Sequence, residues 1–227
     1  MTDFPIQVDE AYARSHNEFL RDAKRLQISA GILAVILAGI IAAVFYFRGP
    51  DLVSFAVAIS LGFFALLSLI MIPVLPKKMG SPQEYYAAYK LAPAMVAEVN
   101  ARDMVIMAYV DANADPQKAP RGAGEMVVPA LAVRTVTSIP GVPREVGARV
   151  PSMAVTGYRP TRGPKVYEEI SPMPVAWGTP DEKVWKEAER ALPTNQWKKL
   201  EGMLDRVQEA KKADRNVLFL EGRPGKK

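Results

Sequence analysis

The stretch ISAGILAVILAGIIAAVFYF, residues 28–47, contains no charged side chain, and neither does LVSFAVAISLGFFALLSLIMIPVL, residues 52–75. Only the four residues RGPD at 48–51 separate them. A helix of about 20 apolar residues crosses the hydrocarbon core of a bilayer, so each stretch is long enough to span one. Four residues cannot connect two helices that run in the same direction. We therefore expect a transmembrane helical hairpin over residues 27–78, with both outer ends on one side of the membrane.

The basic residues near the two spans predict which side this is. Arg48 and Asp51 stand in the turn, whereas the outer ends of the spans carry six basic residues: Arg14, Arg21, Lys24, Arg25, Lys77 and Lys78. Basic residues next to a span stay in the cytoplasm. The first stretch is too long and starts too far along the chain to be a cleavable signal peptide. The sequence thus predicts a two-span plasma-membrane protein with both termini cytoplasmic, in contact with membrane lipid.

Small residues recur every four positions in both spans. The rows are Ala30, Ala34, Ala38 and Ala42 in the first span, and Ser54, Ala58 and Gly62 in the second. Such rows allow helix backbones to approach closely in lipid. They either join the two helices of the hairpin or dock it on helices of another integral membrane subunit, and Ala34, Ala38, Ala58 and Gly62 are the candidate partner contacts. Neither span contains an ionisable residue, which argues against an ion path, a proton relay or a transport site.

The remaining residues divide into an arm, a domain and a tail. Residues 1–26 form a charged cytoplasmic arm that we expect to extend the first helix from a loose start at Phe4-Pro5. Pro73 and Pro76 should end the second helix, because proline interrupts helical hydrogen bonding. Residues 79–220 should form a β-rich cytoplasmic domain with C-terminal helices, followed by a basic tail at 221–227.

Short β-strand patterns dominate the first part of this domain. The candidate strands are 95–99, 104–110, 126–139, 149–158 and 166–175, with a last one at 217–220. Strands this short and closely spaced predict a small antiparallel barrel, SH3-like or OB-like in size, or a strongly bent sheet. The fold class is thus a membrane α-hairpin plus an α+β cytoplasmic domain.

Two or three helices should flank the barrel. Ser81-Pro82-Gln83-Glu84 and Thr179-Pro180-Asp181-Glu182 are capping boxes with proline at the first helical position. Thr194 can cap a further helix, in which four apolar residues form a stripe: Trp197, Leu200, Leu204 and Val207. We expect this stripe to pack on the barrel.

Reactive chemistry is scarce in the sequence. The absence of cysteine excludes disulfides, thiol catalysis and Cys-ligated metals. The single histidine, His16, lies on the charged arm. Asp111-x-Asn113-x-Asp115 copies the start of an EF-hand loop, but Pro116 replaces the required glycine and Gly122 the final glutamate. Calcium binding is the alternative to a polar hairpin loop there. We expect no enzyme activity, no metal and no cofactor.

The charge of the domain is nearly balanced. Residues after 79 contain 22 Lys and Arg against 18 Asp and Glu. This small excess suits a domain beside an anionic leaflet. Nucleic-acid affinity comes largely from neutralising phosphates, so we expect no nucleic-acid partner.

A proline-rich ribbon at 170–180, ISPMPVAWGTP, connects the last barrel strand to the capped helix. It either braces the barrel against its helices or forms an exposed recognition edge with Trp177 as the anchor, because tryptophan is enriched at binding hot spots. With the segment VGARVPSMAVTG at 146–157 and the two spans, this ribbon resembles an uncharacterised actinobacterial family of two-span membrane proteins. The resemblance implies no catalytic residues. Related small proteins of corynebacteria resemble accessory subunits of the cytochrome bcc–cytochrome oxidase supercomplex.

The sequence therefore predicts a non-catalytic accessory or scaffolding subunit of a plasma-membrane complex. The resemblance makes the respiratory supercomplex, with cytochrome bcc and cytochrome oxidase, the first partner to consider. The alternative is a membrane-tethered module that binds nucleic acid or a ligand on the barrel face.

Overall fold

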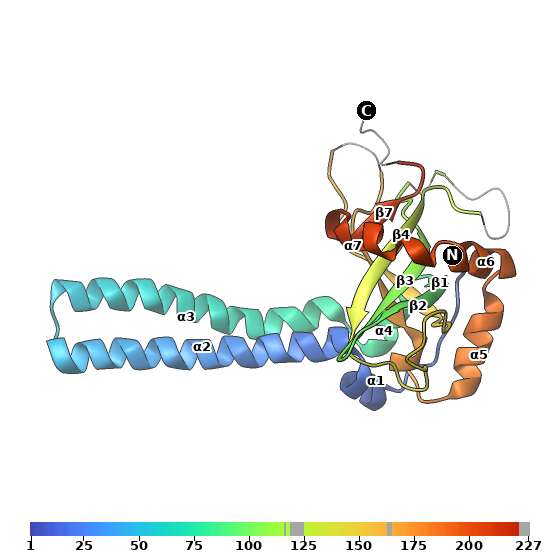
Figure 1. The fold of residues 1–227 in the computed structure, drawn as a ribbon. Coiled ribbons are helices and arrows are strands. Elements are labelled where there is room, and N and C mark those ends of the chain that lie inside the picture. The colour runs from blue at the N-terminus through green and yellow to red at the C-terminus, as the bar shows by residue number, and fades with distance from the viewer. Residues whose placement is uncertain (116, 119–124, 163–164, 223–227) are drawn as a thin grey trace. The chain divides into compact units, whose positions relative to one another are not determined.

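The chain forms two compact units in a computed structural model that describes residues 1–115, 117–118, 125–162 and 165–222, and the side chains of all of these except 75–79. One unit is Asn17–Ser81. The other combines Met1–His16 with Pro82–Lys227, so it is built from segments on both sides of the first. Figure 1 shows the elements of each unit.

The unit Asn17–Ser81 is an antiparallel pair of long helices, α2 (Glu18–Arg48) and α3 (Leu52–Met79). The side chain of Asn17 caps the start of α2 by accepting from the backbone N–H of Phe19. Gly49 ends α2 at φ 76°, a left-handed conformation that glycine adopts without a Cβ clash. Both helices are long and apolar enough to cross a membrane.

The structure corrects the expected end of the second span. The helix α3 continues through Pro73 and Pro76 to Met79. Pro76 has no N–H to donate to the carbonyl of Ile72, four residues earlier. The side-chain amide of Gln27 on α2 donates to that carbonyl oxygen at 2.6 Å. A neighbouring helix thus supplies the donor that proline removes, as often happens in membrane helices.

Two antiparallel sheets form the centre of the other unit. One has the strand order β1-β5-β6 and the other β2-β3-β4-β7. The strands are β1 (Leu91–Ala92), β2 (Ala94–Val99), β3 (Met104–Asp111), β4 (Pro129–Val136), β5 (Ser152–Thr156), β6 (Ile170–Pro174) and β7 (Val217–Phe219). Pro93 alone separates β1 from β2, so one extended segment passes from the first sheet to the second. This is the bent antiparallel arrangement that the short strands predicted.

Helices pack on the sheets, but the apolar stripe expected on a single helix is divided: Trp197 and Leu200 lie in one helix, Leu204 in a 3₁₀ turn and Val207 at the start of the next helix. The helices are α4 (Pro82–Ala87), α5 (Glu182–Ala191), α6 (Thr194–Glu201) and α7 (Val207–Lys212), with 3₁₀ turns η1 (Val175–Trp177), η2 (Leu204–Arg206) and η3 (Asp214–Asn216). Helix α6 contacts β2 and β3, and α7 contacts β4 and β7. The side chains of Trp197 and Leu200 on α6 are buried. The fold class is therefore confirmed: an apolar helical hairpin and a small antiparallel α+β domain with flanking helices.

Two expected helix caps differ from the structure. Asp181 caps α5, because its carboxylate accepts from the backbone N–H of Lys183 at 2.9 Å. The Thr179 hydroxyl instead accepts from the backbone N–H of Asp181, the residue immediately before α5. Thr194 is the first residue of α6, and no side chain caps that helix.

The N-terminal arm is divided between the two units. Thr2 exchanges two backbone hydrogen bonds with Leu91 at 3.0 and 2.8 Å, and the side chain of Gln83 bonds to the backbone of Ile6 and Val8. A short helix α1 (Glu10–His16) follows, separate from α2. The expected loose start is therefore wrong, because Ile6 and Val8 bury apolar side chains that hold the segment on the domain.

Candidate functional site

The two helices of the hairpin meet along a seam in which half of the residues are small. On α2 the less exposed residues are Gln27, Ala30, Gly31, Ala34, Leu37, Ile41, Val44 and Phe45. On α3 they are Ser54, Val57, Ala58, Leu61, Gly62, Ala65, Ser68 and Ile72. These positions recur at intervals of three and four, which keeps one face of each helix toward the other, as in a coiled coil. The α3 row of Ser54, Ala58 and Gly62 lies in the seam, whereas on α2 the row leaves the seam after Ala34, because Ala38 and Ala42 are exposed.

The four candidate contacts in the spans fall at different places. Ala34 is 6% exposed, within the seam, and Ala58 is half-buried. Ala38 is exposed on the outer face of α2. Gly62 is half-buried, but a Cβ at this position would meet no atom within 4 Å. Ala34 and Ala58 thus belong to the hairpin itself, whereas Ala38 and Gly62 leave room for something outside it.

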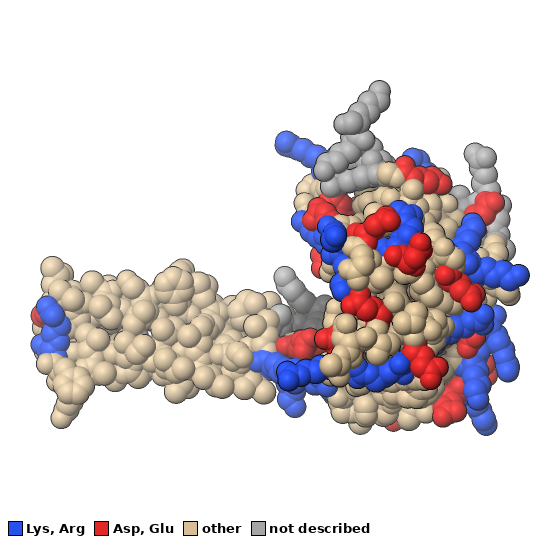
Figure 2. Space-filling view, in the orientation of Figure 1, with Lys and Arg blue, Asp and Glu red and all other residues tan. Residues whose placement is uncertain are grey.

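The outer faces of the hairpin are apolar along its length (Figure 2). Within the most apolar 18 residues of α2 and of α3, 6% and 0% are buried. Phe47 and Leu52 are 84% and 86% exposed. A protein surface of this extent normally contacts another apolar phase. These helices place the chain among membrane proteins.

The turn between the spans is electrostatically closed. Arg48 Nε donates to Asp51 Oδ2 at 2.8 Å, and Asp51 Oδ1 accepts from the backbone N–H and the hydroxyl of Ser54, each at 2.7 Å. The hydrogen bonds from Ser54, followed by Arg48, lower the pKa of Asp51 to about 2. Asp51 is therefore ionised at neutral pH and neutralises Arg48, so the described turn carries no net charge.

Trp177 is a core residue and is not available as a recognition anchor. Its side chain is 0% exposed, and its indole N–H donates to the carbonyl of Ser138 at 3.0 Å. The guanidinium of Arg134 lies 5.6 Å from the ring centroid. Of the two interpretations of the proline-rich ribbon, the bracing role therefore agrees with the structure.

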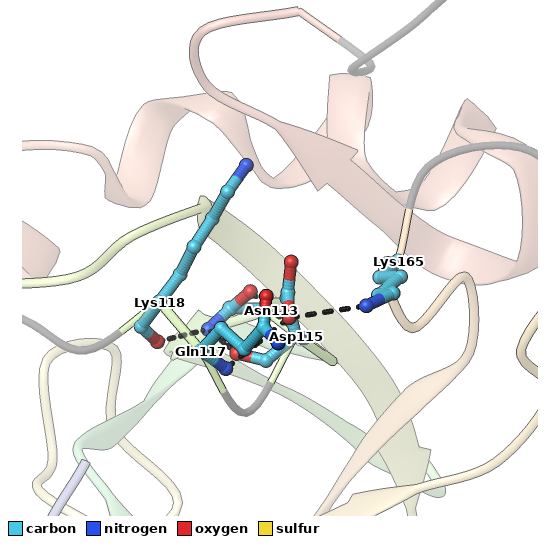
Figure 3. Close-up of polar contacts among 5 residues, drawn as sticks. All are labelled: Asn113, Asp115, Gln117, Lys118 and Lys165. Carbon is cyan, nitrogen blue, oxygen red and sulfur yellow. Dashed lines mark hydrogen bonds and ion pairs between the residues drawn. The ribbon is translucent and has the colours of Figure 1, made fainter.

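The EF-hand-like loop after β3 is a chain of polar turns (Figure 3). Asp111 accepts from three backbone N–H groups, those of Asn113, Val127 and Val128, at 2.9 to 3.0 Å. Asn113 accepts from the N–H of Asp115 and donates to two carbonyls. These bonds join the end of β3 to the start of β4.

Asp115 completes this network. Its Oδ1 accepts from the N–H of Gln117 at 3.2 Å and from Lys165 Nζ at 3.4 Å. The first of these bonds, then Lys165, hold the pKa of Asp115 below its usual range. Across the described residues, no group of three or more His, Asp or Glu side chains could hold a metal ion. Pro116 and Gly122, the two departures from an EF-hand loop, lie outside the described residues.

His16 and the adjacent carboxylates Glu168 and Glu169 are separate from one another. His16 lies on α1, where its ring stacks on Tyr12 with centroids 3.9 Å apart. Glu168 is paired with Arg215 at 3.0 Å, whereas Glu169 accepts from the backbone N–H of Tyr158. These residues do not form a catalytic pair.

Sequence reasoning missed the role of Gln27. It is the amide residue at the polar edge of the first span, and a proline stands at the matching edge of the second. That pairing of an amide with a missing backbone donor was the available signal. This signal can be interpreted only when the two helices are known to be antiparallel.

The chain is similar to a protein family and to a solved structure. A family described as "Protein of unknown function (DUF3239)" matches residues 77–208, more than half of the chain. A crystal structure of a "putative membrane protein" from Corynebacterium diphtheriae is similar, with 43% sequence identity and a TM-score of 0.52. The match covers 58% of this chain and 100% of that one. No curated protein matches the chain.

Proposed function

The chain belongs to the DUF3239 family, and we propose that it is a non-catalytic accessory subunit of a plasma-membrane protein complex. In this proposal α2 and α3 form a two-span anchor that docks beside the spans of other subunits. The mixed α+β domain covers a cytoplasmic surface of the same complex. The observation that carries the proposal is the hairpin, whose seam uses small residues and whose outer faces are apolar on every side.

The domain is built from segments that precede and follow the hairpin, which supports an even number of membrane crossings. Residues 1–16 precede the hairpin and residues 82–222 follow it, yet they form one folded unit. Thr2 is bonded to Leu91, and the N–H of Asp9 donates to the carbonyl of Gly178 at 2.9 Å. Segments that share a sheet must lie on the same side of a membrane, which is what a two-span hairpin provides.

The charges support a cytoplasmic domain. Arg14, Arg21, Lys24 and Arg25 adjoin the first span on the domain side, and the only arginine of the turn is neutralised by Asp51. Translocating a neutral turn agrees with the rule that basic residues remain inside.

A labelling experiment tests this orientation. The chain has no cysteine, so Pro50→Cys and Lys183→Cys each provide a single exposed thiol. We expect a membrane-impermeant maleimide to label Pro50→Cys in intact cells and Lys183→Cys only after lysis. Labelling of Lys183→Cys from outside would overturn the proposed topology.

The outer face of α2 is the proposed docking surface. Ala38 is exposed, and a Cβ at the neighbouring Gly39 would meet no atom within 4 Å. Close backbone approach by another helix is possible at such positions. Gly62 on α3 has the same open space.

Co-purification of the full chain in mild detergent tests the docking. We expect Gly39→Leu and Gly62→Leu to lose the partner subunits detected by mass spectrometry, and the lipid-facing Ile36→Leu to keep them. Retention of the partners by both glycine variants would contradict the proposed surface. The first partners to look for are cytochrome bcc and cytochrome oxidase, and the support for these two is the family resemblance alone.

One observation favours a second function, a membrane-tethered ligand-binding module. The end of the domain beside the Asp111–Lys118 loop contains a hollow of about 550 Å³, which is within the usual size of small-molecule sites. Nucleic acid is less well supported, because acidic and basic groups alternate over the visible face of the domain (Figure 2).

A further inference from the structure

The hollow lies where three strands of the domain end. Lys90 precedes β1, Asp111 ends β3 and Thr156 ends β5, and the segments before β1 and after β3 and β5 contribute to the wall, together with Met1. The charged side chains of the lining are Lys90, Lys118, Arg159, Asp111 and Asp115. Three cations therefore face two carboxylates across a space large enough for a molecule of mononucleotide size.

Both carboxylates are engaged by the protein. Asp111 is 7% exposed and accepts from three backbone N–H groups. Asp115 accepts from Gln117 and pairs with Lys165, a cation that is not part of the lining. Hydrogen bonds and ion pairs of this kind use the acceptor capacity of a carboxylate. The two anions thus offer little to a ligand.

The three cationic side chains of the lining differ from the two carboxylates in this respect. Among the described residues, no ion pair or side-chain hydrogen bond involves Lys90, Lys118 or Arg159. The backbone carbonyl of Lys118 accepts from Asn113 Nδ2 at 2.8 Å and its backbone N–H donates to the carbonyl of Asp115 at 3.1 Å, while Figure 3 shows its side chain extending away from the network. The polar turns thus fix the backbone of Lys118 and leave its ammonium group free to bind.

We propose that this hollow binds a small phosphate ester, with Lys90, Lys118 and Arg159 as the groups that contact the phosphate. Lysine and arginine form charge-assisted hydrogen bonds with phosphate oxygens, and arginine does so through two N–H groups at once. Tyr89 and Tyr167 also line the hollow and provide aromatic faces for the remainder of the ligand. A phosphate ester at this site could come from a soluble nucleotide or from a glycerophosphate head group of a lipid.

Titration of the full chain in a neutral detergent tests the site. The probes are inorganic phosphate, AMP and glycerol phosphate, followed by isothermal calorimetry. The pocket variant is Lys90→Gln, Lys118→Gln, Arg159→Gln. The control, Lys183→Gln, Lys199→Gln, Lys212→Gln, removes the same charge from exposed residues that do not line the hollow.

We expect saturable binding of at least one ester, weakened roughly tenfold or more in the pocket variant and less than twofold in the control. Tighter binding of AMP than of glycerol phosphate would identify a soluble nucleotide as the source, and the reverse a lipid head group. Lys118→Arg alone should retain binding, which separates loss of charge from loss of folding. No saturation with any probe up to 10 mM, or equal weakening in both triple variants, would overturn the proposal.

The same measurement distinguishes this site from the anchoring function. Gly39→Leu, which disrupts the proposed docking surface, should leave phosphate-ester binding unchanged because the hollow is built from residues of the domain alone. Failure of either proposal therefore leaves the other intact.

Discussion

In α2 and α3 most of the large apolar side chains are exposed and small residues make up half of the seam, whereas in the two sheets the large apolar side chains are buried. Phe47 is 84% exposed, while Met107 and Trp177 are 0% exposed. The sheets follow the rule for water, which drives apolar area out of contact with solvent. The hairpin follows the rule for lipid, where close backbone packing holds helices together. A large apolar side chain therefore stabilises the domain when it is buried, whereas on the hairpin it can remain on the surface that faces lipid.

The strongest contrast should come from removing one aromatic side chain in each unit. We expect Trp177→Ala to lower the free energy of unfolding of the domain by about 4 kcal/mol, because it leaves a cavity in the core. Phe63→Ala, on the outer face of α3, should change stability by less than about 1 kcal/mol, since lipid replaces the lost contacts. Denaturant unfolding of the full chain in detergent, followed by circular dichroism, measures both. Similar losses in the two variants would break the comparison.

A second test asks whether the N-terminal segment belongs to the water-facing unit. Ile6 is 4% exposed on the domain, so Ile6→Ala should cost about 3 kcal/mol of domain stability. The exposed neighbour Gln7 is the control, and Gln7→Ala should change stability by less than about 0.5 kcal/mol. An unchanged melting temperature for Ile6→Ala would restore the loose arm that the sequence alone suggests.

Overpacking should affect only the seam of the hairpin. Ala34→Leu inserts a larger side chain where the helices touch and should destabilise the pair by about 2 kcal/mol. Ala38→Leu adds the same volume on the outer face and should leave the isolated protein unaffected. Steric-trapping measurements of hairpin dissociation in bicelles separate the two. Equal effects would place both alanines in one environment.

The smallest expected effect concerns the hydrogen bond across the hairpin. Gln27→Leu removes the donor to the Ile72 carbonyl and should cost about 1 kcal/mol, in the range measured for such bonds in membranes. Infrared spectroscopy with a ¹³C label in the Ile72 carbonyl should show its band shifting to higher frequency. Ser60→Ala is the control, because the Ser60 hydroxyl bonds only to its own helix at Ala56. The band should not move in that variant.

The sequence was most informative where one local property determines structure. The uncharged length of 28–47 and 52–75 predicted both helices, and the short apolar runs 95–99 and 104–110, separated by a turn, predicted β2 and β3. The end of α3 was not predictable, because the carbonyl of Ile72, which Pro76 leaves without a helical donor, is satisfied by Gln27 on the other helix, 49 residues before Pro76 in the sequence. Local rules for proline contain no information about such a partner.

The candidate sites show the same limit. Trp177 reads as a binding anchor in isolation, and its burial depends on Ser138 and Arg134, which are distant in sequence. The hollow was not predicted, because Lys90, Lys118 and Arg159 share no motif and meet only at the strand ends. By contrast, the Asp-x-Asn-x-Asp spacing did predict a polar turn, since each of these side chains bonds to a backbone N–H two residues on.

The joining of residues 1–16 to the domain has a consequence for the order of assembly during synthesis. The N–H of Val8 and the carbonyl of Ile6 bond to Gln83, 75 and 77 residues along the chain. Once α2 and α3 have paired, the chain between these partners that lies outside the hairpin shortens to residues 9–17 and 80–82, which lowers the entropic cost of closing the loop by roughly 1.5 kcal/mol. Insertion of the hairpin therefore favours completion of the domain.

The hydrogen bond of Asp9 forms later still, because its partner Gly178 is synthesised about 170 residues after it. At ~5–20 residues per second this interval is roughly ten to thirty seconds. During that time Ile6 and Val8 have no domain to cover them, and the nascent chain is already held at the bilayer. The N-terminal segment is thus synthesised well before its partner Gly178, and in this interval a chaperone or the translocation machinery has access to its apolar side chains.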